Sequence, residues 1–241
     1  MEKNAVREKQ RWHDMRVTPL NKIKRRIYNF NQFERDQWVA HQANRIQKGA
    51  KVLDVGAGPC RYKHHFSHCI YKAHDFAKTP GQKYGELDYV SDIVNIPVPD
   101  GSFDTIVCTE VLEHVPDPVA AVKEFSRILV PNGKLILTAP LGSGLHQEPF
   151  HYYGGFTPHW YRHALEESEF TEVTIESNNG FFKMYGQETM RFVNYLKEIN
   201  IVLYLLFFPL KIFIPILAHF IDHYDREAKF VAGYHVTAKR K

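Results

Sequence analysis

The stretch that decides the fold is KVLDVGAGPC, residues 51–60. Three aliphatic residues stand before its first glycine and predict a buried β-strand, because branched apolar side chains suit a packed, pleated surface. Gly56 and Gly58 predict a sharp turn after this strand, in which the backbone can approach a ligand with no Cβ in the way. We expect a helix from about Arg61, with its free N–H groups directed into the same space.

The residues of this turn distinguish between two classes of cofactor-binding site. The dinucleotide pattern G-x-G-x-x-G needs its third glycine for close packing of helix on strand, and Arg61 stands at that position. An NAD-dependent oxidoreductase is therefore disfavoured. Asp54 precedes the glycines and gives the form D-x-G-x-G, in which no pyrophosphate has to be held. A purely structural turn that carries two glycines is the remaining alternative.

Length and charge set the broad class. A chain of 241 residues with a formal net charge of +4 suits one decorated α/β domain that favours anionic surfaces, and we expect no nucleic-acid partner. The three cysteines, Cys60, Cys69 and Cys108, form no C-x-x-C pair, so we expect reduced thiols. With no secretory signal predicted at the N-terminus, we expect a cytoplasmic protein, with the inner face of a membrane as a more specific alternative.

Residues 1–48 are basic, with interleaved aromatic residues such as Trp12 and Trp38. We interpret this segment as a helical N-terminal cap beside the sheet, with a helix over residues 33–47. Two alternatives remain open, namely a lid over the cofactor and a basic surface that meets lipid head groups.

Strands and helices alternate after the glycine turn, which predicts a parallel, doubly wound sheet with its ligand at the carboxyl ends of the strands. Expected strands are residues 70–74, 87–90, 105–108, 134–138 and 171–177, and expected helices are residues 118–130 and 157–168. Asp75 ends the second strand, 17 residues past Gly58. A carboxylate there suits the hydroxyl groups of a ribose, although it could also simply begin a turn.

Four strings occur in an order and spacing that resembles class I S-adenosylmethionine (SAM) methyltransferases of the type 11 group. They are DVGAGP, Asp75, SDIVNIPVPDGSFDTIVCTEVLEHVPDP and LVPNGKLILTAP. The resemblance covers about residues 48–182 and a last strand at 230–239. It implies a mostly parallel seven-stranded sheet of order 3-2-1-4-5-7-6, whose last strand is antiparallel.

The resemblance also implies a domain organisation and a set of cofactor contacts. Residues 49–185 and 230–241 would form the SAM-dependent methyltransferase domain, and residues 186–229 an apolar helical insertion. The implied cofactor-binding residues are Asp54, Gly56, Ala57, Gly58, Asp75, Phe76, Asp92, Ile93 and Glu110. The chain departs from the pattern at Cys60, where many relatives have glycine, and this leaves open a non-catalytic membrane- or partner-binding protein on the same scaffold.

The string TEVLEHV, residues 109–115, suggests a metal site. If residues 110–114 form a helical turn, Glu110, Glu113 and His114 share one face and could bind Mg²⁺ or Mn²⁺. The string is similar to that of ubiquinone-biosynthesis O-methyltransferases, and His151 or His146 would complete the site. The alternative is that the histidine packs beside the cofactor with no metal.

Residues 145–161 are dense in histidine, tyrosine and glycine and follow the fifth strand. A hydroxyl acceptor needs positioning and a base. His151 is our first candidate for that base and His146 the second, and we expect Tyr152 and Tyr153 to orient the substrate. The alternative is that these residues pack the loop onto the sheet.

Residues 199–221 read INIVLYLLFFPLKIFIPILAHFI and are long enough to span a bilayer. Lys211, Pro209 and Pro215 argue against a simple span, because charge is costly at mid-bilayer and proline breaks or kinks a helix. Three interpretations remain: a kinked hairpin in one leaflet, a dimer or lid interface, and a true span. The sequence thus predicts a SAM-dependent methyltransferase for a small-molecule or lipid-linked acceptor, with a hydroxyl oxygen as the expected methylation site, at a membrane surface or as a homodimer.

Overall fold

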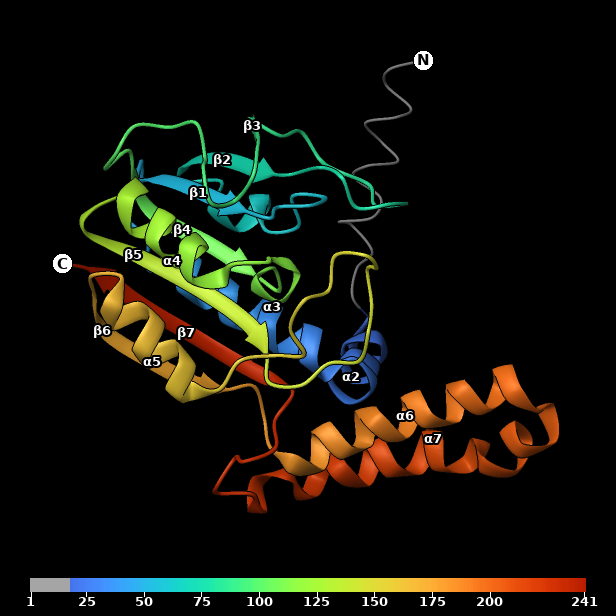
Figure 1. Cartoon of the computed structure of the whole chain (residues 1–241). Helices are drawn as coiled ribbons and strands as arrows, with labels where there is room; N and C mark the ends of the chain where they lie inside the picture. The colour runs from blue at the N-terminus through green and yellow to red at the C-terminus, as the bar shows by residue number, and fades with distance from the viewer. Residues whose placement is uncertain (1–17) are drawn as a thin grey trace.

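A twisted sheet of seven strands forms the centre of the computed structural model, which describes residues 18–241 (Figure 1). The strands are β1 Lys51–Val55, β2 Ile70–Asp75, β3 Tyr89–Val90, β4 Phe103–Thr109, β5 Leu129–Pro140, β6 Phe170–Ser177 and β7 Gly233–Arg240. Their order is β3-β2-β1-β4-β5-β7-β6, as predicted. β7 alone runs antiparallel to its neighbours β5 and β6. Trp12 and the other residues before Thr18 lie outside the described residues.

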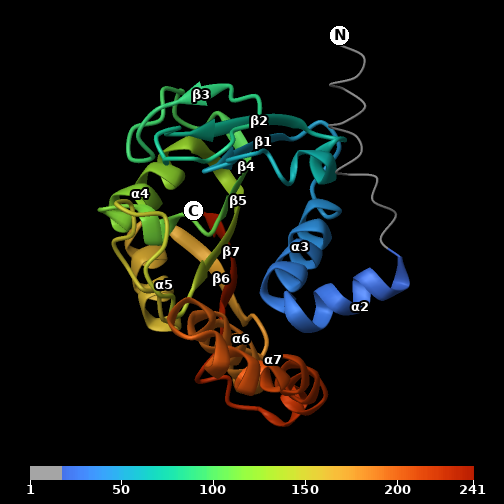
Figure 2. The same cartoon turned by 90° about the vertical axis from the view of Figure 1, so that its right-hand side faces the viewer.

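Helices cover both faces of the sheet. Figure 2 shows α3 on one face and α4 and α5 on the other, while α6 and α7 extend beyond the sheet. The α-helices are α2 Pro19–Tyr28, α3 Phe30–Ala43, α4 Pro118–Ile128, α5 Pro158–Glu167, α6 Phe181–Ile199 and α7 Ile201–Ile221, with 3₁₀ turns η1 Lys63–Phe66, η2 Leu112–His114 and η3 Asp222–Tyr224. α3 therefore packs beside the sheet, as the cap interpretation expects, whereas α2 packs against α3 and α7.

Local sequence explains where α4 and α5 begin. The Asp117 carboxylate accepts a hydrogen bond of 2.9 Å from the N–H of Ala120, and the Thr157 hydroxyl accepts one of 3.2 Å from the N–H of Trp160. A proline follows each cap at the first helical position, where no N–H is needed. These two devices fix the loops that leave the carboxyl ends of β4 and β5.

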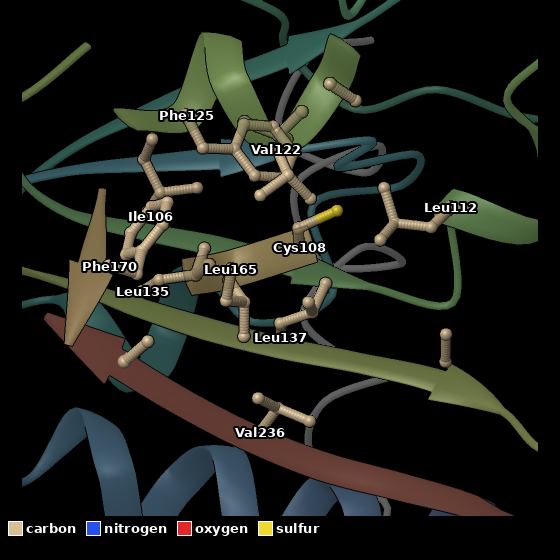
Figure 3. Packing of buried hydrophobic residues seen from close by; sticks show 14 of the residues in the cluster. Ile106, Cys108, Leu112, Val122, Phe125, Leu135, Leu137, Leu165, Phe170 and Val236 are labelled. Carbon is tan, nitrogen blue, oxygen red and sulfur yellow. The ribbon is translucent and has the colours of Figure 1, made fainter. Parts of the chain in front are cut away.

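The main core lies between the sheet and α4 and α5. Figure 3 shows Ile106 and Cys108 of β4 beside Leu135 and Leu137 of β5, with Phe125 of α4 above them, all fully buried. The 3.6-residue period of apolar side chains in α4 places them on this one face. A second cluster joins α3 to the opposite face of the sheet, so the strands are buried on both sides.

The chain after the glycine turn differs from expectation. In place of an α-helix from about Arg61, the structure has only the 3₁₀ turn η1, which begins at Lys63. Cys60 adopts a φ of 55°, a left-handed conformation that right-handed helical backbone does not continue through. Cys60 thus takes the backbone shape that glycine adopts freely.

The apolar insertion forms a helical pair. α7 runs unbroken through Pro209 and Pro215, so of the break or kink expected at these prolines the break does not occur. Each proline removes only one N–H donor, and close packing holds the helix, since a Cβ on Gly186 of α6 would lie 3.1 Å from the Cα of Pro215. Among the described residues, only the helical segment 201–224 is long and apolar enough to cross a membrane, judged by length and composition alone.

Candidate active site

A cavity of about 320 Å³ opens at the carboxyl ends of β1, β2 and β4. This is where a parallel α/β sheet binds its ligands, and the volume suits a small organic molecule. Six of the predicted cofactor residues line it, namely Gly56, Asp75, Phe76, Asp92, Ile93 and Glu110. The other three, Asp54, Ala57 and Gly58, are not among the lining residues.

Gly56 is required by its surroundings. Its φ is +71°, and a Cβ at this position would lie 2.3 Å from Cγ2 of Val111. Such a contact is far shorter than packed carbon atoms allow, so only glycine brings β1 this close to the turn after β4. Val111 itself lines the cavity, and this residue was missed by sequence reasoning.

Asp75 holds the second glycine in place. Its carboxylate accepts hydrogen bonds from the backbone N–H groups of Gly58, at 2.9 Å, and Ala77, at 3.0 Å. A carboxylate has about four acceptor positions, so each oxygen retains capacity for a ligand hydroxyl. The side chain is buried, yet it lines the cavity. Asp75 therefore both fixes the turn and presents free acceptor positions to the bound molecule.

Asp54 has an interior position. It is almost fully buried on β1 and accepts a hydrogen bond of 2.6 Å from the hydroxyl of Tyr71. Burial raises the pKa of Asp54 to about 7, with a further contribution from Asp75, while the bond from Tyr71 acts in the opposite direction. The Asp54 carboxyl thus contributes to the structure behind the cavity wall.

His74 is a second lining residue that was missed. Its Nε2 lies 3.1 Å from the carbonyl of Ser91, whereas its buried Nδ1 has no partner among the described residues. Because a carbonyl oxygen only accepts, Nε2 carries the proton and Nδ1 offers a lone pair. A signal existed in the sequence, since His74 immediately precedes Asp75 at the end of β2.

Glu110 does not lie on a helical turn, so the predicted common face with Glu113 and His114 is wrong. Its φ is +52°, and η2 begins only at Leu112. The Glu110 carboxylate accepts a hydrogen bond of 2.9 Å from Thr138 and forms an ion pair of 3.0 Å with Arg35 of α3. Arg35 was also missed, because nothing local to its sequence marks it.

Three histidines gather beside Glu113. The ring centroids of His114 and His146 are 4.8 Å apart, and those of His146 and His151 are 4.5 Å apart. The candidate ligand atoms of Glu113, His114 and His146 all lie within 4.8 Å of one another. Of the predicted donors, Glu113, His114 and His146 therefore come together, whereas Glu110 and His151 do not belong to this group.

Hydrogen bonds set the tautomers of this cluster. Nδ1 of His114 donates to the carbonyl of Phe150, and Nδ1 of His146 lies 2.9 Å from the carbonyl of Gly144. Both rings therefore keep a lone pair on Nε2, which suits a metal ion or a proton. Burial, with His146 and His151 nearby, lowers the pKa of His114.

Glu113 supplies the carboxylate of the cluster. Its side chain is almost fully buried, and its Oε2 has no partner among the described residues. Burial, followed by the nearby Glu110 carboxylate, raises the pKa of Glu113 well above its ordinary value. An unsatisfied buried carboxyl oxygen is costly, so a cation or a donor group at this position would be stabilising.

The loop after β5 is anchored on the same residue. The backbone carbonyl of Glu113 accepts N–H bonds from Tyr152 at 2.9 Å and Tyr153 at 3.1 Å. Tyr152 lines the cavity at the carboxyl ends of the strands, whereas the hydroxyl of Tyr153 donates to the carbonyl of Pro116. His151, the first candidate for the base, lies 3.2 Å from the Ser143 hydroxyl. It lines neither this cavity nor the adjoining one, which is lined by Glu113 and His146.

A second cavity, of about 410 Å³, adjoins the first. Glu110 lines both cavities, while Glu113 and His146 face the second one. Its far side is formed by Asn31 of α3 and by Gln187 and Arg191 of α6. The histidine and glutamate cluster therefore lies between two spaces, one at the carboxyl ends of the strands and one beside the helical pair.

Residues 53–137 match the family model described as "Methyltransferase domain". The chain carries a methyltransferase domain. The matched segment runs from β1 to β5 and holds the glycine turn, Asp75 and the TEVLEHV string, so the resemblance drawn from the sequence is confirmed. It makes up about a third of the chain, which leaves the N-terminal helices, the loop after β5 and the helical pair outside it.

A curated relative matches part of the chain. The ubiquinone biosynthesis O-methyltransferase of Xanthomonas oryzae pv. oryzae is 35% identical over 103 residues, which cover 37% of this chain and 43% of that protein. The match thus spans less than half the length of this relative. More than half of the present chain lies outside this match.

Solved structures share the fold over most of the chain. A putative sarcosine dimethylglycine methyltransferase from Galdieria sulphuraria aligns with a TM-score of 0.54 at 17% identity and covers 85% of this chain and 84% of that one. A Haemonchus contortus phosphoethanolamine N-methyltransferase 2, solved with S-adenosylhomocysteine, aligns with a TM-score of 0.52 at 16% identity. This alignment covers 95% of the present chain and 59% of that one. At these identities the likeness shows the methyltransferase fold alone.

Proposed function

We propose that this protein is a SAM-dependent methyltransferase that acts on a hydroxyl group of a small-molecule or lipid-linked acceptor. The observation that carries the proposal is a pair of adjoining cavities that share Glu110, one with Gly56 and Asp75 in its wall and one lined by Glu113 and His146. Such a pair suits a donor and an acceptor that must meet at one point.

The first cavity fits the cofactor. Asp75 retains acceptor capacity for the two ribose hydroxyls, and the orphaned Nδ1 of His74 offers a further acceptor in the same wall. Asp92 and Ile93 line the side expected for the adenine. Bound SAM would supply an activated methyl group on its sulfonium, and Glu110 lies in the wall that both cavities share.

The second cavity fits the acceptor. A hydroxyl held there must be aligned with the methyl group and must lose its proton as the new C–O bond forms. His146 is the candidate base that lines this cavity, and its Nε2 keeps a lone pair. We therefore rank His146 before His151, while Tyr152, in the wall of the first cavity, remains a candidate for orienting the reactants.

The cluster between the cavities fits a divalent cation. Glu113, His114 and His146 offer one carboxylate and two imidazoles, and the Oε2 atom of Glu113 is buried without a partner among the described residues. This mixed donor set favours Mn²⁺ over Mg²⁺, because Mg²⁺ prefers oxygen ligands. Such a cation would polarise the acceptor hydroxyl and lower its pKa. It would occupy Nε2 of His146, so His146 is proposed as the base for the metal-free site and as a ligand when the cation is bound.

A membrane surface in the cytoplasm is the proposed place of action. The support is the exposed helix α7, whose most apolar window is only 11% buried, and the basic helix α2 beside it. An acceptor carried by a lipid would be presented there. Homodimer formation through the same helices is the competing proposal.

The test of methyl transfer uses SAM labelled with tritium in its methyl group. The protein is incubated with a membrane lipid extract or with an aqueous metabolite extract, and the label is followed into each phase. We expect label in the organic phase that resists mild alkali, as an ether does, and that disappears in Gly56→Ala. Label in neither phase, from a protein that binds SAM, would favour the non-catalytic alternative.

A further inference from the structure

One face of α7 is a continuous apolar stripe. It consists of Val202, Leu206, Leu210, Phe213, Leu217 and Phe220. Their spacing of three and four residues places them on one side of the helix. Their exposed fractions run from 40% to 69%, so six large apolar side chains face solvent together. A soluble monomer seldom exposes a patch of this kind, which marks an interface.

The opposite face of α7 is the one that packs on α6. The ring of Phe207 lies 5.8 Å from that of Phe192, and Lys211 donates a hydrogen bond of 2.6 Å to the side chain of Asn194. The mid-helix charge that argued against a membrane is therefore satisfied within the helical pair. No residue of α6 or α7 belongs to the buried clusters that hold the described sheet together.

A basic helix lies against α7. The Tyr28 hydroxyl at the end of α2 donates to the carbonyl of Ile212 at 3.2 Å. α2 contains no acidic residue, and its exposed Lys22, Lys24 and Arg26 have no ion pair with another described residue. Exposed apolar side chains stand among these cations, namely Leu20 and Ile23. Cations mixed with apolar residues on one helix are typical of contact with anionic lipid.

The helical pair cannot cross a bilayer without a large cost. Asp222, just after α7, accepts hydrogen bonds from the N–H groups of Gly180, at 3.0 Å, and Lys183, at 2.8 Å, so the start of α6 and the end of α7 are held together. Asn200 alone joins their other ends. α6 would therefore accompany α7 into the membrane, together with its five charged residues.

We propose that the apolar stripe of α7 and the basic helix α2 dock the protein onto one leaflet of an anionic lipid bilayer. The charge of α2 complements the lipid head groups, and the stripe enters the boundary between head groups and acyl chains. A second copy of this chain explains the exposed stripe less well, because an interface built around it would bring two uncompensated cationic helices toward the same contact.

The docked arrangement has a consequence for the acceptor, which rests on the proposed function. Gln187 and Arg191 of α6 line the second cavity, so that cavity lies between the cofactor cavity and the docking helices. An amphiphilic acceptor could keep its tail in the leaflet and its polar head in this cavity. The enzyme would then act without extracting the acceptor fully into water.

The test measures co-sedimentation of the full chain with vesicles of phosphatidylcholine, with and without phosphatidylglycerol. We expect binding to the anionic vesicles that weakens with salt. Two variants should each reduce it at least about tenfold: Leu206→Gln with Phe213→Gln and Phe220→Gln, and Lys22→Glu with Lys24→Glu and Arg26→Glu. Matched controls at exposed positions elsewhere, Ile70→Gln and Lys123→Glu, should bind as wild type.

Three outcomes would overturn the proposal. The protein stays in the supernatant as a monomer, or both triple variants bind vesicles as well as wild type. The third outcome is that wild type does not bind vesicles and light scattering in detergent-free buffer shows it to be a dimer, whereas the variant with Leu206→Gln, Phe213→Gln and Phe220→Gln is a monomer. S-adenosylhomocysteine binding is measured in parallel. Retained cofactor binding without vesicle binding refutes the docking alone, whereas vesicle binding without cofactor binding refutes the proposed function alone.

Discussion

Arg35 and Glu110, 75 residues apart in sequence, form an ion pair of 3.0 Å, and Glu110 lines both cavities. Arg35 lies on α3, outside the segment that matches the methyltransferase domain, and Glu110 directly follows β4 inside it. Thr138 of β5 supports the same carboxylate. The N-terminal helices therefore complete the site, and they do so by compensating the charge of a residue that both cavities share.

Replacing Arg35 with methionine should lower the free energy of unfolding by about 1–3 kcal/mol, because Glu110 would keep its charge in a partly buried place without its cation. Urea denaturation at neutral pH measures the change. Adding Glu110→Gln should restore part of the loss. The control is Lys239→Met, which removes an exposed pair with Glu172 and should cost less than about 1 kcal/mol. Equal losses in both variants would contradict this account of Arg35.

Replacing Gly56 with alanine should destabilise the protein by about 3 kcal/mol and abolish cofactor binding. The new Cβ would face Val111 at 2.3 Å, and the φ of +71° disfavours any side chain. Gly49→Ala is the matched control, since Gly49 has a φ of +83° with nothing within 4 Å of the new Cβ. It should cost only about 1–2 kcal/mol. Unimpaired binding in Gly56→Ala would show that the turn does not approach the ligand.

The contribution of Asp54 to stability should fall as pH rises from about 4 to about 7. Its folded pKa of about 7 lies above the ordinary value of 3.8, so the folded protein binds the proton more tightly than the unfolded chain does. The stabilisation is present below the unfolded pKa and is lost as pH passes through the folded pKa. Asp54→Asn should remove about 2–4 kcal/mol of this dependence.

Urea denaturation of wild type and Asp54→Asn at about pH 5 and about pH 8 checks the sign. Because the variant lacks the falling contribution of Asp54, its stability at about pH 8 relative to about pH 5 should be higher than that of wild type. The substitution itself has a cost, but that cost is the same at both pH values and cancels in the comparison. Parallel pH profiles would mean that Asp54 titrates in the folded protein as it does in the unfolded chain.

The sheet could be predicted because its signals are local. Apolar runs marked the strands, and α4 and α5 each begin with a local signal, a capping aspartate or threonine followed by proline. The spacing of Gly58 and Asp75 was also sufficient to predict that they lie close together. Asp75 ends β2, and Gly58 lies in the turn after β1, the adjacent parallel strand. The left-handed backbone at Cys60 and Glu110 could not be predicted, because nothing in the sequence separates such residues from their neighbours before the chain folds.

The rest of the site depends on long-range contacts. His146 reaches Glu113 and His114 only because the loop after β5 folds back and donates two N–H groups to the Glu113 carbonyl. The prediction of one helical face for Glu110, Glu113 and His114 was therefore wrong, although Glu113 and His114 do belong to the cluster. Arg35 gave no signal at all, since its partner is set by how α3 packs on the sheet.

The cluster should bind Mn²⁺ through Glu113, His114 and His146. Titration of the metal-free protein with MnCl₂, followed by electron paramagnetic resonance, measures the affinity. Glu113→Gln and His146→Ala should each weaken binding at least about tenfold, as loss of one of three ligands does. His159→Ala, at an exposed position on α5, is the control and should have no effect. Equal affinity in all four proteins would exclude this cluster as the metal site.

The central claim is that the cavity at the carboxyl ends of the strands binds SAM, and calorimetric titration tests it most directly. Wild type, Asp75→Ala and the exposed control Asp100→Ala are each titrated with SAM, S-adenosylhomocysteine and NAD. We expect the adenosyl compounds to bind wild type and the control, to bind Asp75→Ala about 100-fold more weakly, and NAD not to bind at all. Failure of wild type to bind either adenosyl compound, or undiminished binding in Asp75→Ala, would contradict the claim.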